Sequence, residues 1–328
     1  MLTFTPLDVD DDEALRNYGA LAEASDEATL GGSAPKDVPE LRAALQPNEY
    51  RGYVIELLHR DREAVGFLNA TLPQRENADQ FQAYPVFRPD LMDDEALHLV
   101  VADRVGVLAR EHGRRPTMWM LLPADGDPDD PALPANRAAA RLGLRRRSLM
   151  TCTGAPLPLA EHLLAERVDV VDGYRIDLWQ GPVAREWVEP LLTLYRRFDA
   201  DIPIEDQDRQ APVRTEERLR TAEAWFEAQR IEIVRAVAIA PDGTLAGLSE
   251  VEVGARGSLA FQETTVVLTE HRGYGLGRAL KLATHAELSR RERLTSIVTW
   301  TSHVNPWMNA INDELGYRIR HREGCYQG

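Results

Sequence analysis

The sequence has very few cysteines: Cys152 and Cys325 are the two among 328 residues. Two isolated cysteines exclude a disulfide framework and a cysteine-rich zinc site, and we expect both to be free thiols without a catalytic role. No apolar run approaches the length that spans a bilayer, and no basic and then apolar leader follows Met1. These absences predict a cytoplasmic protein with no membrane partner.

Basic residues are also scarce relative to acidic ones. The chain has 38 Lys and Arg against 53 Asp and Glu, which gives a net charge of -15. An acidic surface repels the nucleic-acid backbone, so we expect no nucleic-acid partner. The same surface attracts cationic small molecules such as amines, although acidity also serves solubility alone.

One glycine-rich segment has chemistry that can be read from the sequence: Arg272-Gly273-Tyr274-Gly275-Leu276-Gly277. The residue pattern predicts a strand over 261–268 before this segment and a helix over 278–288 after it. Glycines let the chain turn sharply and bring backbone N–H groups to the start of a helix, where unpaired donors and the helix dipole attract an anion. The segment therefore predicts a site for a phosphate-bearing ligand.

Spacing excludes two common phosphate motifs. A dinucleotide fold requires Gly-x-Gly-x-x-Gly at the opening of an early βαβ unit, whereas the order here is Arg-x-x-Gly-x-Gly. A Walker loop requires Lys-Ser or Lys-Thr after its last glycine, whereas Arg278-Ala279 follows Gly277.

The pattern Arg272-x-x-Gly275-x-Gly277 resembles the acyl-CoA loop of the GNAT acetyltransferase superfamily. The features that follow this loop in the family are present in order: a strand over 297–301, then Asn305, then a short helix that ends at 315–317. The resemblance covers residues 174–328. It implies an acyl-CoA-dependent N-acetyltransferase that uses acetyl-CoA, or another short acyl-CoA, as co-substrate and needs no metal. The acyl group would pass by direct attack to an amine of a small molecule or peptide.

The chain also contains an internal repeat with a period of roughly 170 to 180 residues. A hairpin predicted over 53–69 is matched over 232–248, and the helix ending at 142–144 is matched at 315–317. We expect an α/β fold with two tandem GNAT-like domains, 1–171 and 172–328, each a mixed, mostly antiparallel sheet flanked by helices. The layout is similar to that of bacterial tandem acetyltransferases such as the mycothiol synthases. Both a monomer and a homodimer fit it.

The first copy lacks the cofactor loop. After a strand predicted over 81–87, the chain continues through 88–95 with one proline, four acids and no glycine. The acids repel a pyrophosphate, and the missing glycines prevent close approach of the backbone. We therefore expect domain 1–171 to be degenerate and domain 172–328 to bind acetyl-CoA.

The resemblance implies roles for individual residues of the second copy. Backbone over 273–277, which includes Tyr274 and Leu276, would hold the pyrophosphate, and Arg272 would add positive charge together with Arg278 or Lys281. Val267, Leu268 and Thr269 would pair with the pantetheine arm, and the N–H assigned to the thioester oxygen is that of Leu268. Asn305 would contact the cofactor arm, although an Asn before Pro306 is also a good helix N-cap.

Strand alternation places Phe261, Glu263, Thr265 and Val267 on one face if no bulge intervenes. We predict Glu263 as the general base that accepts the proton of the acceptor amine, with Glu250, Glu252 and His303 as alternatives.

The family's general acid, a Tyr seven residues after the Asn, is replaced by Asn312, which does not donate a proton to a thiolate. Tyr317, Tyr326 or water would have to supply it. This departure leaves a second hypothesis open, a non-catalytic acyl-CoA-binding regulatory module. The acidic segment 199–212 is expected to be a mobile loop near the acceptor site. Trp300 and Trp307 are candidates for either the acceptor pocket or the core.

Overall fold

The computed structural model describes residues 2–165 and 173–328. The first half contains β1 (Leu2–Pro6), α1 (Asp12–Leu30), α2 (Val38–Ala44), β2 (Arg51–Arg60), β3 (Glu63–Pro73), β4 (Gln80–Phe87), η1 (Pro89–Leu91), α3 (Glu95–Glu111), β5 (Arg115–Leu122), α4 (Pro134–Arg141) and β6 (Arg145–Pro156). The second half contains β7 (Arg175–Gln180), η3 (Arg185–Trp187), α6 (Val188–Asp201), α7 (Glu216–Ala228), β8 (Glu232–Ile239), β9 (Leu245–Val253), β10 (Leu259–Val267), η4 (Thr269–His271), α8 (Leu276–Leu288), β11 (Ser296–Ser302), α9 (Pro306–Glu314) and β12 (Arg318–Gln327). The short helix α5 (Glu161–Ala165) follows β6. The predicted domain junction at 171 and 172 lies outside the described residues.

The two halves repeat the same order of elements. Each runs through a strand, two helices, three antiparallel strands, a helix, a strand, a helix and a final strand. Both predicted hairpins are present, as β2–β3 and β8–β9. The predicted duplication of an α/β unit is therefore confirmed.

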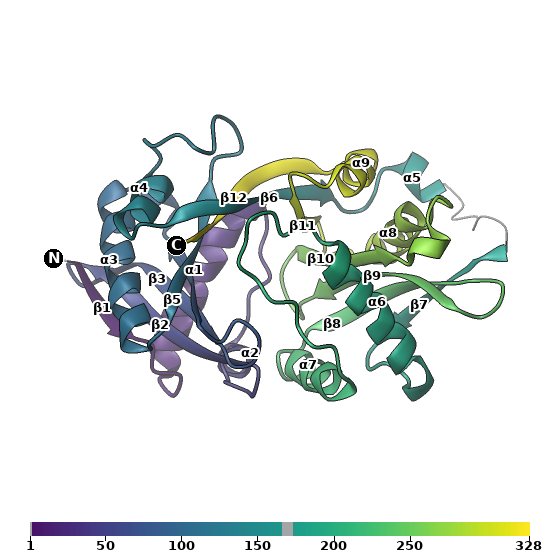
Figure 1. The fold of residues 1–328 in the computed structure, drawn as a ribbon, viewed down its shortest axis with the longest axis horizontal. Helices are drawn as coiled ribbons and strands as arrows, with labels where there is room; N and C mark the ends of the chain where they lie inside the picture. Colours follow the sequence, from purple (N-terminus) through teal and green to yellow (C-terminus); the bar gives the residue numbers. More distant parts are fainter. Residues whose placement is uncertain (1, 166–172) are drawn as a thin grey trace.

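The strands of both halves join in a single sheet. Within the described residues, this sheet has 12 strands in the order β1-β2-β3-β4-β5-β12-β6-β11-β10-β9-β8-β7. Neighbours are antiparallel except for the parallel pairs β4–β5 and β10–β11. The final strands of the two halves have changed places, because β12 pairs with β5 while β6 pairs with β11. Figure 1 shows β6 and β12 running between the halves, with the C terminus against the first half.

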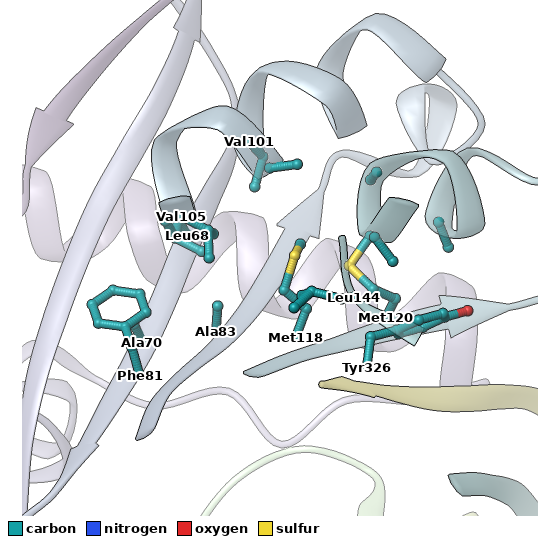
Figure 2. Packing of buried hydrophobic residues seen from close by; sticks show 14 of the residues in the cluster. Leu68, Ala70, Phe81, Ala83, Val101, Val105, Met118, Met120, Leu144 and Tyr326 are labelled. Atoms are coloured by element: carbon teal, nitrogen blue, oxygen red, sulfur yellow. The ribbon is translucent and has the colours of Figure 1, made fainter. Parts of the chain in front are cut away.

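The exchanged strand β12 completes the core of the first half. Tyr326 of β12 is 2% exposed and belongs to a buried cluster with Met118 and Met120 of β5 and Leu144 (Figure 2). Its hydroxyl donates a hydrogen bond to Asn136 Oδ1 at 2.5 Å. Burial of an aromatic ring contributes strongly to core stability, so the first half depends on residues near the end of the sequence.

Helices cover both faces of the sheet in the second half. Leucines of α6 and α7 form a buried cluster with Val237 and Leu248 on one face. On the other face, Leu276 and Leu280 of α8 cluster with Ala236 and other alanines of β8 and β9. The small alanine side chains allow α8 to approach the sheet closely, so the start of α8 lies near the end of β10.

Candidate functional site

The glycine-rich loop joins β10 to α8, as predicted. Gly273 and Gly275 have φ angles of +86° and +71°, a left-handed conformation that favours glycine. A Cβ at either position would meet nothing within 4 Å. Gly275 is the N-cap of α8, and no side chain caps this helix. In the described part of the chain, no acceptor pairs with the N–H groups of Gly273, Tyr274 or Gly277, so the positive end of α8 presents open donors.

Arg272 is held by protein groups. Its Nε donates to the Val267 carbonyl oxygen at 3.0 Å, and its guanidinium forms an ion pair with Asp201 at the end of α6. Asp201 also accepts from Arg197 Nε at 2.6 Å. Arg272 and Arg197 thus share the carboxylate of Asp201, and the contacts of Arg272 hold the loop against α6.

Lys281 does not lie at the loop, so the expectation that it adds charge near a phosphate is wrong. It is 1% exposed, its Nζ donates to Asn312 Oδ1, and it lies 4.6 Å from the centre of the Tyr317 ring. Burial lowers the pKa of Lys281 to about 7. The other basic candidate, Arg278, pairs with Glu314 at 2.8 Å.

Strand β10 carries a bulge in its pairing with β9. Gln262 pairs with Val251 and Thr265 with Ser249, so β10 uses one residue more than β9 between these positions. An extra residue reverses the alternation of side chains beyond it.

This bulge changes which residues share a face. Glu263 lines a cavity under α6 and α7, whereas Val267 packs against α8 on the opposite face. The register places Thr265 on the α8 face with Val267, and Phe261 on the face of Glu263. The prediction that Phe261, Glu263, Thr265 and Val267 share one face is therefore wrong.

Strands β10 and β11 separate at the same place. Their parallel pairing runs from Leu259 to Phe261, and both strands continue beyond it. One edge of β10 consequently faces a gap rather than a neighbour. The Leu268 N–H donates to the Ala246 carbonyl of β9 at 2.9 Å, so it points away from this gap and does not match the donor role predicted for it. Because successive N–H groups of a strand alternate in direction, the Val267 N–H faces the gap.

A cavity of about 230 Å³ lies between the bulge and helices α6 and α7. Four carboxylates line it, those of Glu223, Glu250, Glu252 and Glu263, and they differ in their partners. Glu250 is 7% exposed and accepts from the Tyr195 hydroxyl at 2.6 Å and from Arg235 Nε at 2.7 Å. Within residues 2–165 and 173–328, Glu252 and Glu263 have neither a hydrogen-bond partner nor an ion-pair partner.

Burial raises the pKa of Glu263, and the charge of Glu250 raises it further. Burial likewise raises the pKa of Glu252, with the charges of Glu263 and Glu250 adding to the effect. Glu263 has surface open to the cavity, which alone would favour an ordinary pKa. The protein atoms around the cavity and the charge of Glu250 both act in the upward direction. Such carboxylates are suited to accept a proton near neutral pH.

The remaining predicted residues have other surroundings. Asn305 is the N-cap of α9 and accepts from the Met308 N–H at 3.2 Å, so its capping role is confirmed. His303 is 43% exposed and lies 3.6 Å from Glu205 Oε1. Trp307 is 83% exposed and is therefore not a core residue.

The tyrosines considered as acids are buried away from the cavity. Tyr317 is 1% exposed and shares a hydrogen bond of 2.6 Å with His285 Nε2, while Tyr326 lies in the core of the first half. Asn312 is also buried and donates to Thr301 Oγ1 at 3.2 Å.

The segment 199–212 is anchored to the first half, in contrast to the mobile loop expected. The N–H of Asp208 donates to Gln327 Oε1 at 2.9 Å, and the N–H of Gln210 donates to Asn77 Oδ1 at 2.7 Å. The segment 199–212 therefore lies at the interface between the two halves.

Sequence reasoning missed Tyr195 and Arg235 as the groups that hold Glu250. One signal was present: Arg235 stands among apolar residues in the strand 232–239, whose other charged residue, Glu232, is at its start. A buried arginine requires a carboxylate partner, so its position indicated an acid on a neighbouring strand.

Three further findings concern the described residues. Their helices include none that is both long and apolar enough to cross a bilayer. The same residues contain no group of three or more His, Cys, Asp or Glu side chains that could hold a metal ion. Cys152 and Cys325 are buried free thiols.

A scan of protein-family models finds no match to this chain, and a search of curated proteins finds none. Solved structures are similar to it. A tandem GNAT protein from the clavulanic acid biosynthesis pathway, solved without acetyl-CoA, has a TM-score of 0.75 at 23% identity over 100% of this chain and 98% of that one. A GCN5-related N-acetyltransferase from Sphaerobacter thermophilus has a TM-score of 0.65 at 14% identity, covering 100% and 95%. The N-myristoyltransferase of Saccharomyces cerevisiae with bound myristoyl-CoA and inhibitors has a TM-score of 0.55 at 10% identity, covering 99% and 79%. The chain therefore has the tandem GNAT fold.

Proposed function

We propose that this protein transfers an acetyl or other short acyl group from acyl-CoA to an amine, and that the second half alone binds the coenzyme. One observation carries the proposal: the uncapped start of α8 adjoins the gap between β10 and β11, beside a cavity that holds two unpaired carboxylates. A diphosphate, an extended amide arm and an amine each meet complementary groups there. We place the reaction in the cytoplasm, with residues 1–171 as the half that binds no coenzyme.

The coenzyme would bind along backbone groups. The N–H donors of 273–277 would accept the diphosphate at the positive end of α8. The exposed edge of β10 would pair with the amides of the pantetheine arm, as an added strand does. The Val267 N–H would then meet the thioester oxygen as negative charge develops, an interaction worth about 3 kcal/mol in comparable sites.

Glu263 would act as the base, directly or through water. It accepts a proton from the acceptor ammonium, and the resulting amine attacks the thioester carbonyl. The C–S bond breaks as the amide forms, the second amine proton is released, and the thiolate of CoA takes a proton from water. Because Tyr317 and Tyr326 are buried away from the cavity, neither supplies that proton.

A non-catalytic acyl-CoA-binding module is the second candidate, and Asn312 in place of the expected Tyr favours it. The two candidates differ in turnover. Calorimetry with acetyl-CoA, NAD and ATP tests the binding site, and release of free thiol from acetyl-CoA across a panel of primary amines tests the reaction. We expect the protein to bind acetyl-CoA and to bind neither NAD nor ATP. We also expect the rate of thiol release to depend on the amine that is added.

Each other outcome decides between the candidates. Binding of acetyl-CoA without thiol release from any amine would favour the regulatory module. Failure of the protein to bind acetyl-CoA would refute both candidate functions.

A further inference from the structure

Two cavities lie next to each other along helix α7. The first is the cavity of about 230 Å³ that contains Glu263. The second, of about 380 Å³, lies between α7, the anchored segment 199–212 and strands of the first half. Arg218 and Ala222 line both cavities. These residues are four apart on α7 and so share a face of it, which makes the cavities neighbours along that face.

The basic residues of the first cavity are already neutralised. Each pairs with a carboxylate at 2.6 to 2.9 Å: Arg214 with Asp199, Arg218 with Glu76, and Arg235 with Glu250. Its fourth acid, Glu223, pairs with Arg220 at 2.6 Å. The acids of this cavity that have no ion-pair partner among the described residues are Glu252 and Glu263, and an ammonium group beside them would favour their ionised form.

The second cavity has the opposite balance. Arg218 is committed to Glu76 and stacks over the Tyr50 ring at 4.5 Å. Arg51 lies over the Trp225 ring at 4.2 Å, and Arg209 is exposed on the segment 199–212. Among the described residues, neither Arg51 nor Arg209 has a carboxylate partner. The unbalanced charges of this cavity are therefore positive.

The two sets of charges are close enough to act on one another. The positive charge of Arg51 lowers the pKa of Glu252, against the larger upward effect of burial. A ligand that fills both cavities would meet carboxylates at one end and guanidinium groups at the other. Guanidinium binds carboxylate through paired hydrogen bonds, which adds orientation to the attraction between the charges.

We propose that the two cavities form one acceptor site for an amine that carries a carboxylate at its other end, such as an amino acid. The inference rests on the proposed function and specifies its substrate class. The ammonium would lie at Glu252 and Glu263, and the carboxylate at Arg51 and Arg209. The arginines overcome the repulsion that a chain with a net charge of -15 otherwise exerts on an acidic substrate.

The test compares acceptors matched in length. Thiol release from acetyl-CoA is measured with a series of ω-amino acids, 5-aminopentanoate among them, and with the alkylamines that lack the carboxylate. We expect kcat/KM to be about ten-fold higher for the best amino acid than for its alkylamine, chiefly through KM. Equal use of both across the series would overturn the inference and leave the proposed function intact.

Variants test the arginines. Arg209→Gln removes an exposed side chain that forms no ion pair with the described residues, so the fold should be retained, and it should reduce the preference for the amino acid about ten-fold. Arg51→Gln should do the same, although it also removes the stacking on Trp225. The matched control is Arg16→Gln on α1, whose side chain is 63% exposed and pairs with Asp12; it should leave the preference unchanged. An unchanged preference in Arg209→Gln and Arg51→Gln would contradict the inference.

Equilibrium binding separates the two proposals. Calorimetry of 5-aminopentanoate in the presence of CoA measures acceptor binding without any reaction. If Arg209→Gln binds 5-aminopentanoate more weakly than wild type and no amine causes thiol release, the acceptor site is supported and the acyltransferase activity is refuted. If wild-type protein binds neither 5-aminopentanoate nor the other ω-amino acids of the series, the acceptor site is refuted, whatever the outcome for acetyl-CoA.

Discussion

The starts of helices α3 and α8 occupy equivalent places in the two halves and treat their backbone donors in opposite ways. At α3, the Asp94 side chain accepts from the Leu97 N–H at 3.2 Å and pairs with Arg60 at 2.6 Å. The bond from Arg60 is the largest influence that lowers the pKa of Asp94. At α8, Gly275 leaves the donors open. One half caps its helix start with its own side chain, and the other leaves its helix start uncapped.

The strands that lead into these helices differ in the same sense. The pairing of β4 with β3 has no register shift, and Ala83, four residues before the end of β4, is fully buried. The pairing of β10 with β9 has the bulge, and Glu263, four residues before the end of β10, opens into a cavity. A regular strand fills a core, whereas an irregular one exposes a side chain for chemistry.

Removal of the Glu263 carboxylate, which has no counterpart in β4, should have the largest effect on the reaction rate. Glu263→Gln should reduce kcat for thiol release by roughly 100- to 1,000-fold, since it removes a general base, with acetyl-CoA affinity retained. Glu292→Gln, in the exposed turn after α8, is the control and should behave as wild type. A loss of less than three-fold in Glu263→Gln would assign the base to another group.

The pH dependence follows from the same carboxylate. Burial raises the pKa of Glu263 to about 7, and a base works only when it is deprotonated. The kcat/KM of wild-type protein should therefore fall as the pH drops through about 7, and the inflection should be lost in Glu263→Gln. A wild-type inflection near the ordinary range of glutamate, about 4.3, would contradict the enclosed environment.

Making the start of α8 resemble that of α3 should have the next largest effect. Gly275→Asp places an acid at the N-cap, and it should weaken acetyl-CoA binding by roughly 30- to 100-fold through repulsion of the diphosphate. Gly143→Asp is the matched control, since Gly143 has the same φ of +71° and equally open surroundings. Equal binding by both variants would show that this helix start is not the diphosphate site.

The reverse change tests stability instead of binding. Asp94→Ala removes the cap of α3, and it should lower the free energy of unfolding by about 1 to 2 kcal/mol, measured by urea denaturation. Acetyl-CoA binding should not change, because we propose that the coenzyme binds to the second half alone. A weaker affinity for acetyl-CoA in Asp94→Ala would indicate a coenzyme site in the first half.

Substitution of Arg272 should have the smallest effect on acetyl-CoA binding. Its guanidinium already forms an ion pair with Asp201, so Arg272→Gln should weaken acetyl-CoA binding by no more than about three-fold, as expected for a partly exposed ion pair. Arg290→Gln, at the other end of the helix region and 77% exposed, serves as the control. A loss of 30-fold or more would mean that Arg272 leaves Asp201 to bind phosphate.

The elements that local patterns define could be predicted from the sequence. Glycines between an alternating segment and a helical one located the loop, and the repeated hairpins indicated the duplication. The exchange of β6 and β12 could not be predicted, because which distant strand pairs with β12 depends on the assembled sheet. The bulge at Glu263 could not be predicted either, because one extra residue in a strand does not change the local sequence pattern. The bulge nevertheless moves Thr265 and Val267 to the other face of the sheet.

The exchange of strands also bears on how the protein is made. A ribosome that has released residues 2–156 has supplied every strand of the first half except the one between β5 and β6, since β12 arrives only with residues 318–327. Until then, the edge of β5 and the apolar surface that Tyr326 later covers remain open to water and to chaperones. The nascent first half must therefore wait for nearly all of the second to be synthesised.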